Sequence, residues 1–155
     1  ISNRPAAPGW VAAQALGLQV GVVDHRQFGS REAFDAVLQQ RIDEFAPSLV
    51  VLAGFMRILT AGFVQHYSGR LVNIHPSLLP DFTGLNTHQR ALDAGRKVVG
   101  FTVHAVTVVL DHGAILAQAQ VPFLKGDTPS SLAGRVKEQE HRIYPAVICA
   151  LLSGA

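Results

Sequence analysis

The spacing of apolar and polar residues along the chain follows two patterns in turn, one typical of helices and one typical of strands. Residues 30–45 carry apolar side chains at helical spacing behind Ser30, a favourable N-cap residue, so they predict an amphipathic helix. Residues 49–53, LVVLA, form a continuous apolar run, which is typical of a strand buried on both faces. Residues 71–75, LVNIH, predict another strand, and this one ends in polar groups.

The same patterns predict the remaining elements. Further helices are expected at 10–16, 60–67, 87–94 and 128–153, and further strands at 18–23, 98–109 and 114–121. Alternation of strand and helix indicates a parallel sheet with crossover helices, and the last two strands add an antiparallel element. We therefore expect an α/β fold with an open, mostly parallel twisted sheet and helices on both faces. Without a linker, residues 1–155 are expected to form a single domain.

Composition narrows the functional classes. Hydrophobic residues make up 48% and charged residues 15% of the chain, which excludes disorder. The formal charge is +2 without a run of Lys or Arg, so nucleic-acid binding is not expected. The one cysteine rules out an intrachain disulfide and favours a reducing, cytoplasmic setting. No apolar run reaches membrane-spanning length, and no Cys/His cluster has zinc-ligand spacing, so neither a membrane nor a metal is expected.

The strand at 71–75 carries the first candidate chemistry. Asn73 and His75 are two residues apart, so their side chains should project from the same face of the strand end. An amide beside an imidazole can stabilise an oxyanion, and the imidazole can move a proton. The alternative is that both residues only satisfy hydrogen bonds at a strand end, and the spacing alone leaves the two interpretations even.

Other polar residues could join them. Asp111 lies in a predicted turn and could orient and charge His75, although an ordinary turn Asp is the simpler interpretation. His104 is either a satisfied core histidine or a neighbour of the site. His112 is expected to be solvated, and His88 could face the loop after Asn73.

Two further segments are candidates for ligand binding. Residues 56–59 follow a buried strand and could line a flat apolar pocket, or simply pack in the core. Arg31 could bind a carboxylate, although such an Arg is more often solvated. Lys137, Glu138 and Glu140 on the last helix have the pattern of a solvated helix face.

Five motifs occur in an order that is familiar from one family: LVVLAGFMRIL, NIHPSLLP, FTGLNTHQRAL, VHAVTVVLDHGAIL and RVKEQEHRIYP. Together they cover essentially the whole chain. The chain resembles the phosphoribosylglycinamide formyltransferase (GAR transformylase) family of the folate-dependent formyltransferase superfamily. The resemblance implies a Rossmann-like formyltransferase fold.

The resemblance also implies a reaction, in which the amine of glycinamide ribonucleotide attacks the formyl group of 10-formyltetrahydrofolate during purine biosynthesis. Asn73 and protonated His75 would stabilise the oxyanion, and Asp111 would hold His75 and assist proton transfer through water. The residues that match the folate site are Arg31, Met56, Arg57, Ile58, Leu59, Asn73, Thr107, Val108, Val109, Leu110 and Asp111. Those that match the nucleotide site are Lys137, Glu138, Gln139 and Glu140.

Two alternative functions stay open. One is a formyltetrahydrofolate hydrolase, in which water replaces the amine, and the other is a catalytically impaired fragment that still binds folate. No metal is implied, and the protein is expected to be a monomer or a homodimer.

The chain also departs from the family pattern. Thr83, Asn86, Val108, Val109 and His112 stand where the family usually has other residues, and these changes are expected to tune the site. The family's first strand, glycine-rich turn and first helix, which cradle the substrate phosphate, have no counterpart before Ile1. The chain is therefore expected to be truncated at its N-terminus and to bind glycinamide ribonucleotide weakly as written.

Overall fold

The computed structural model describes residues 1–154, which form two compact units. The first comprises Ile1–Pro47 and Leu59–Phe63, and the second comprises Ser48–Ile58 and the chain from Val64 onward. The expected single formyltransferase domain over residues 1–155, whose last residue lies outside the described range, stays a prediction.

The first unit is built mainly from helices. Helix α1 spans Pro8–Ala15, a 3-10 turn spans His25–Gln27, and α2 spans Arg31–Asp43. The Ser30 hydroxyl accepts a hydrogen bond from the Ala33 amide at 3.1 Å, which confirms the predicted cap of α2. Helix α1 begins earlier than predicted because proline is well tolerated in the first turn of a helix.

The strand predicted at 18–23 is wrong. Only one parallel bridge, between Ser2 and Val22, forms there. The Ser2 amide donates to the Gly21 carbonyl at 2.9 Å, and the Val23 amide donates to the Ser2 carbonyl at 2.9 Å. The segment has β-prone residues, but a strand also needs a paired neighbour along its length, and the described residues supply only this short contact.

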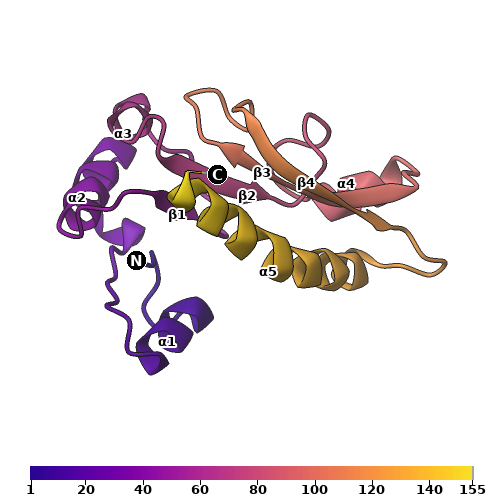
Figure 1. Cartoon of the computed structure of the whole chain (residues 1–155), viewed down its shortest axis with the longest axis horizontal. Helices are drawn as coiled ribbons and strands as arrows, with labels where there is room; N and C mark the ends of the chain where they lie inside the picture. Colours follow the sequence, from indigo (N-terminus) through magenta and orange to yellow (C-terminus); the bar gives the residue numbers. More distant parts are fainter. Residues whose placement is uncertain (155) are drawn as a thin grey trace. The chain divides into compact units, whose positions relative to one another are not determined.

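A four-stranded sheet organises the second unit (Figure 1). Strands β1 (Val50–Leu52), β2 (Leu71–His75), β3 (Val98–Ala105) and β4 (Ile115–Pro122) lie in that order. Strands β1 and β2 pair in parallel, whereas β2 with β3 and β3 with β4 pair antiparallel. The α/β class is confirmed, but this sheet is mixed rather than mostly parallel, because β3 enters beside β2 in the opposite direction.

Helix α5 (Pro129–Ser153) covers the sheet and closes the core of this unit (Figure 1). Its buried side chains Leu132, Val136 and Tyr144 pack in one hydrophobic cluster with residues of β2, β3 and β4. The predicted N-cap is confirmed, since Thr128 and Ser131 form a reciprocal capping box. A strong local start signal and a long apolar stripe together explain why this helix is predictable.

Helices α3 (Ala61–His66) and α4 (Thr87–Asp93) are short. The predicted cap of α4 is wrong: Asn86 occupies the N-cap position with a φ of 56°, and the Thr87 hydroxyl donates instead to the Pro76 carbonyl at 2.8 Å. A buried hydroxyl needs a hydrogen-bond partner, and the acceptor for Thr87 is a carbonyl of the loop after β2.

Candidate functional site

Four polar side chains, which we call the polar cluster, converge at the end of β2. Asn73 and His75 lie on β2, His104 lies on β3, and Asp111 lies in the loop after β3. His75 and His104 are 6% and 2% exposed, and the Asp111 side chain is 5% exposed. The structure thus brings the three predicted catalytic residues together in a site shielded from bulk water.

Asp111 lies between the two histidines. Its Oδ2 atom is 3.7 Å from Nδ1 of His75, and its Oδ1 atom is 3.8 Å from Nε2 of His104. The Gly84 amide donates a hydrogen bond of 2.9 Å to Oδ2 of Asp111 and so holds the carboxylate in place. Both separations from the histidines exceed a direct hydrogen bond and suit an attraction between charges or a bridging water.

Carbonyl partners determine which nitrogen of each histidine carries a proton. Nε2 of His75 lies 2.9 Å from the Phe82 carbonyl, and Nδ1 of His104 lies 2.9 Å from the Ala105 carbonyl. A carbonyl only accepts, so both of these nitrogens are donors. Nε2 of His104 then accepts from Nδ2 of Asn73 at 3.4 Å when the ring is neutral.

Strand register places these side chains on one face of the sheet. Asn73 pairs directly with His104, and His75 pairs with Thr102, across the antiparallel β2–β3 ladder. Opposed residues in such a ladder share a face, and residues two apart along a strand do so as well. The register of β3 against β4 shifts between Val103 and His104, and an irregularity of this kind re-aims nearby side chains.

Gly113 allows the loop carrying Asp111 to return against β3. A Cβ atom at this position would lie only 1.6 Å from the Ala105 carbonyl oxygen. The Ala105 amide donates to the Ala114 carbonyl at 2.9 Å, which ties the loop's end to the strand. Asp111 itself has a φ of 55°, so the loop turns tightly where the carboxylate emerges.

Buried hydrogen bonds hold the loop that follows His75. The fully buried Thr102 hydroxyl donates to the Ser77 carbonyl at 2.7 Å and accepts from the Leu79 amide at 3.0 Å. The Gln118 side chain donates to both the Leu79 carbonyl, at 2.9 Å, and Thr102, at 2.8 Å. The segment NIHPSLLP is therefore a rigid support for the polar cluster.

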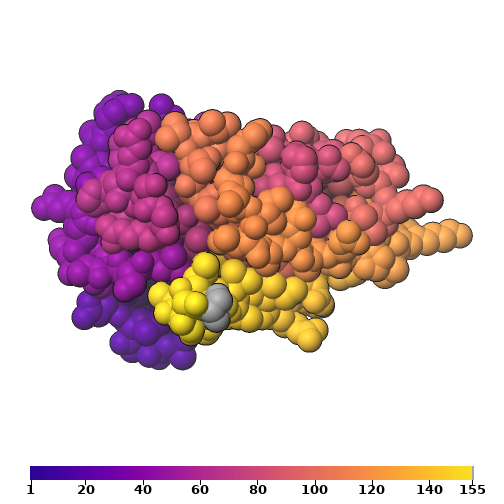
Figure 2. Space-filling model, turned by 45° about the horizontal axis from the view of Figure 1, so that its top comes forward, coloured from indigo at the N-terminus to yellow at the C-terminus, as the bar shows by residue number. Residues whose placement is uncertain are grey.

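Exposed apolar side chains occur in two loops of this unit. Met56 is 74% and Ile58 is 58% exposed, so the alternative that they pack in the core is wrong. Val108, Val109 and Leu110, next to Asp111, are 49–59% exposed. Figure 2 shows the segment around residues 106–114 (orange) standing at the surface. Such side chains can pack against a flat apolar ligand.

Helix α5 contributes a half-buried carboxylate. Lys137 and Glu138 are exposed, whereas Gln139 and Glu140 are half-buried, so Glu140 does not lie on a solvated face. Burial raises the pKa of the Glu140 carboxyl, and the positive charges of His141, Lys137 and His75 oppose that rise. The half-buried carboxyl of Glu140 therefore holds its proton more tightly than a solvated glutamate does.

Several predicted residues lie elsewhere. Arg31 and Leu59 belong to the first unit, and their part in the site stays a prediction. The Thr107 hydroxyl is exposed and donates to the Val109 carbonyl, and His112 is exposed as predicted. His88 is half-buried on α4, where burial lowers its pKa; its Nδ1 atom has no hydrogen-bond partner within residues 1–154.

Three members of the site's inner hydrogen-bond network were not predicted as such: His104, the Phe82 carbonyl and the Gly84 amide. The sequence predicts His104 as either a core residue or a neighbour of the site, and both descriptions apply. The alignment of VHAV opposite NIH in a β ladder would have indicated it. The two backbone groups leave no signal in the side-chain pattern.

Among residues 1–154, no helix combines the length and hydrophobicity that a membrane crossing requires. In the same part of the chain, no group of three or more His, Cys, Asp or Glu side chains is placed to hold a metal ion.

Comparison with known proteins assigns the chain to a family. The family model described as formyl transferase matches residues 1–148. Phosphoribosylglycinamide formyltransferase of Escherichia coli is 48% identical over 99% of this chain and 72% of its own length. The trifunctional purine biosynthetic protein adenosine-3 of chicken is 46% identical over the whole chain, which spans only 16% of that much longer protein.

Solved structures give the same result. Phosphoribosylglycinamide formyltransferase from Coxiella burnetii has a TM-score of 0.91 and 49% identity, covering 98% of this chain and 72% of the other. Glycinamide ribonucleotide transformylase 1 from Symbiobacterium toebii has a TM-score of 0.94 and 43% identity, with 98% and 72% coverage. The chain belongs to the formyl transferase family, and its matched relatives include phosphoribosylglycinamide formyltransferases along nearly its entire length.

Proposed function

We propose that the chain transfers a formyl group from 10-formyltetrahydrofolate to the amine of glycinamide ribonucleotide. The observation that carries the proposal is the placement of Asn73, His75 and Asp111 in one buried cluster at the end of β2. The names of its relatives support this reaction over hydrolysis of the folate and over an inactive folate-binding fragment.

Asn73 is suited to hold the developing oxyanion. Its amide has two N–H donors, and Nδ2 lies at the long distance of 3.4 Å from Nε2 of His104. The second N–H is then available for a negatively charged oxygen. A donor that is already oriented before the reaction stabilises such charge without reorganisation.

His75 and Asp111 supply charge and proton transfer. A protonated His75 would carry its second N–H on Nδ1, directed toward the Asp111 carboxylate 3.7 Å away. The positive ring would stabilise a nearby oxyanion. The gap between the two groups leaves room for a water to relay the proton released by the attacking amine.

The folate supplies the formyl group, and the chain offers apolar surface for its heterocycle. Met56, Ile58 and the exposed run 108–110 present side chains that a flat ring system would cover. We propose backbone groups of 107–111 and the Arg57 segment as its polar partners. For Arg31, whose side chain is 47% exposed, and for Leu59, a role in folate binding stays a prediction from the resemblance.

Residues of helix α5 are proposed to bind glycinamide ribonucleotide. Glu140 is the best candidate for a ribose hydroxyl, because a half-buried carboxylate gains more from a hydrogen bond than a solvated one. Lys137, Glu138 and Gln139 would line the same side of the helix. We also propose a cytoplasmic location, on the basis of the single cysteine, and a monomer or homodimer without a nucleic-acid partner.

The test follows tetrahydrofolate formation from 10-formyltetrahydrofolate, with and without glycinamide ribonucleotide. Product formation that requires the nucleotide, together with a formylated nucleotide found by mass spectrometry, is the expected result. Formate released at the same rate without the nucleotide would establish the hydrolase instead. Folate binding by calorimetry without either product would establish the inactive fragment.

A further inference from the structure

The Phe82 carbonyl is the nearest fixed partner of His75. It accepts the hydrogen bond from Nε2 of His75 at 2.9 Å, while Nδ1 of the same ring faces Asp111. In the neutral ring this bond selects the Nε2–H form and leaves the lone pair on the side of the carboxylate. The position of one backbone carbonyl thus decides which nitrogen of His75 exchanges protons with Asp111.

Surface contacts add to core packing in holding the chain around Phe82, whose half-buried ring packs against the hydrophobic cluster of this unit. Phe82 has a φ of 53°, a left-handed backbone that residues with side chains rarely adopt, so neighbouring contacts must hold it. The guanidinium groups of Arg90 and Arg96 each lie 5.4 Å from the centre of the Phe82 ring. These distances are those of attractive cation–π contacts.

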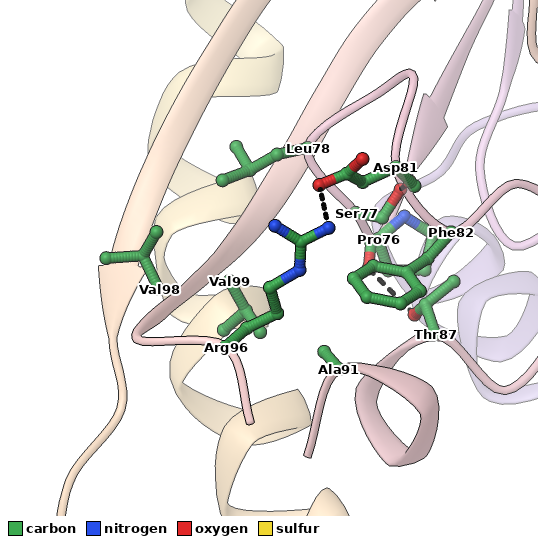
Figure 3. A pocket seen from close by; sticks show the side chains of 10 residues that line it. All are labelled: Pro76, Ser77, Leu78, Asp81, Phe82, Thr87, Ala91, Arg96, Val98 and Val99. Carbon is green, nitrogen blue, oxygen red and sulfur yellow. Dashed lines mark hydrogen bonds and ion pairs between the residues drawn. The ribbon is translucent and has the colours of Figure 1, made fainter. Parts of the chain in front are cut away.

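Both arginines also bind the loop itself. Arg96 pairs with Asp81 at 2.8 Å, and Nη1 of Arg90 donates to the Thr83 carbonyl at 2.6 Å. The residues before and after Phe82 are therefore anchored by the same two side chains that hold its ring. Figure 3 shows the Arg96 side chain extending toward Asp81 beside the Phe82 ring.

A cavity beside the ring gives it room to move on one side if the arginines are removed. The cavity has a volume of ≈ 70 Å³, and apolar side chains such as Ala91, Val98 and Val99 line it together with Phe82 (Figure 3). The preceding residues of the loop do not share this freedom, because Thr102 and Gln118 bind Ser77 and Leu79 from the core.

We propose that Phe82 is a positioning residue for His75, held by Arg90 and Arg96. The inference rests on the proposed function, because it concerns the same catalytic histidine. The Phe82 carbonyl determines which ring nitrogen of His75 keeps its proton. It holds the proton on Nε2, so Nδ1, beside Asp111, is the nitrogen that exchanges protons.

The experiment first determines which nitrogen of the His75 ring carries the proton and then measures kcat for formyl transfer. Long-range ¹H–¹⁵N NMR of the free protein is expected to show the Nε2–H form of neutral His75, with the signal assigned by His75→Asn. Phe82→Ala and the double variant Arg90→Ala/Arg96→Ala are expected to mix the two neutral forms and to lower kcat about tenfold. The KM for glycinamide ribonucleotide should stay within about twofold, and Phe82→Tyr should retain both properties.

Arg70→Ala is the matched control, because Arg70 also lies over an aromatic ring, 5.2 Å from the centre of Tyr67, but outside the Phe82 loop. If Phe82→Ala fails to fold, the double variant Arg90→Ala/Arg96→Ala still tests the proposal, because it changes only exposed side chains. Unchanged His75 signals and an unchanged pH profile of kcat in the folded variants would overturn the proposal. Loss of formyl transfer in the unaltered chain would refute the proposed function alone, since the NMR measurement needs no substrate.

Discussion

The Asp111 carboxylate lies 3.7 Å from Nδ1 of His75, at the meeting point of a strand end and a tight loop. Both groups are almost fully buried, and the Gly84 amide donates a hydrogen bond to the same carboxylate oxygen, Oδ2. A carboxylate held this close to an imidazole can orient the ring and pass a proton to it through a bridging water.

Replacing Asp111 with Asn should lower kcat for formyl transfer by about 100-fold or more, the scale of general acid–base catalysis. The amide keeps the shape of the side chain and can keep the contact with Gly84, but it removes the negative charge beside His75. Steady-state kinetics over a range of pH values measure the effect. Asp93→Asn, an exposed change on α4, is the control, and equal kcat values for the two variants would contradict the role of Asp111.

Replacing Asn73 or His75 with Ala should each reduce kcat/KM by about 100- to 1,000-fold, as expected when an oxyanion loses a hydrogen-bond donor or a nearby positive ring. The double variant should lose much less than the product of the two, because both groups act on the same developing charge. Single-turnover kinetics separate this loss from substrate binding. If the loss in kcat/KM of the double variant equalled the product of the two single losses, the two residues would act independently rather than on the same charge.

Gly113→Ala should destabilise the fold by about 3 kcal/mol or more, because the new Cβ would overlap the Ala105 carbonyl and overpacking alone costs 1–3 kcal/mol. Urea unfolding followed by circular dichroism measures the change. Gly134→Ala on α5 is the matched control: a Cβ there meets nothing within 4 Å, and alanine should add up to about 1 kcal/mol of stability. If Gly113→Ala is neutral, the loop does not approach β3 as described.

Glu140→Gln should separate stability from substrate binding. Burial raises the pKa of Glu140 in the folded chain, so the native state binds this proton more tightly than the unfolded state does. The stability from this protonation is present at low pH and is lost as pH rises from the ordinary glutamate range through the folded pKa. The variant should therefore be more stable than the original chain near pH 7, and the gain should vanish near pH 4.

Urea unfolding at the two pH values tests this expectation, with Glu138→Gln, an exposed neighbour, as the control that shows no gain. The same Glu140→Gln variant should bind glycinamide ribonucleotide less tightly if Glu140 contacts the ribose. A stability gain without any change in nucleotide affinity would remove Glu140 from the proposed nucleotide site while leaving the burial argument intact.

Local signals predicted most of the helices and strands. Ser30 and Thr128 start their helices as expected, because a cap is a contact between residues a few positions apart. The strand at 71–75 was predicted with its observed ends, since apolar residues precede a proline that cannot continue the ladder. The predicted strand at 18–23 failed because pairing depends on a distant neighbour.

The residue pattern alone is enough to assign the family and the order of the chemical groups: an amide and an imidazole on one strand, and a carboxylate before a glycine further along. The antiparallel pairing of β2 with β3, which places Asn73 opposite His104, becomes visible in the folded chain. The same holds for the backbone groups of Phe82 and Gly84 that complete the site. Side-chain patterns record which face a residue prefers, whereas register and carbonyl placement arise from contacts between segments far apart in the chain.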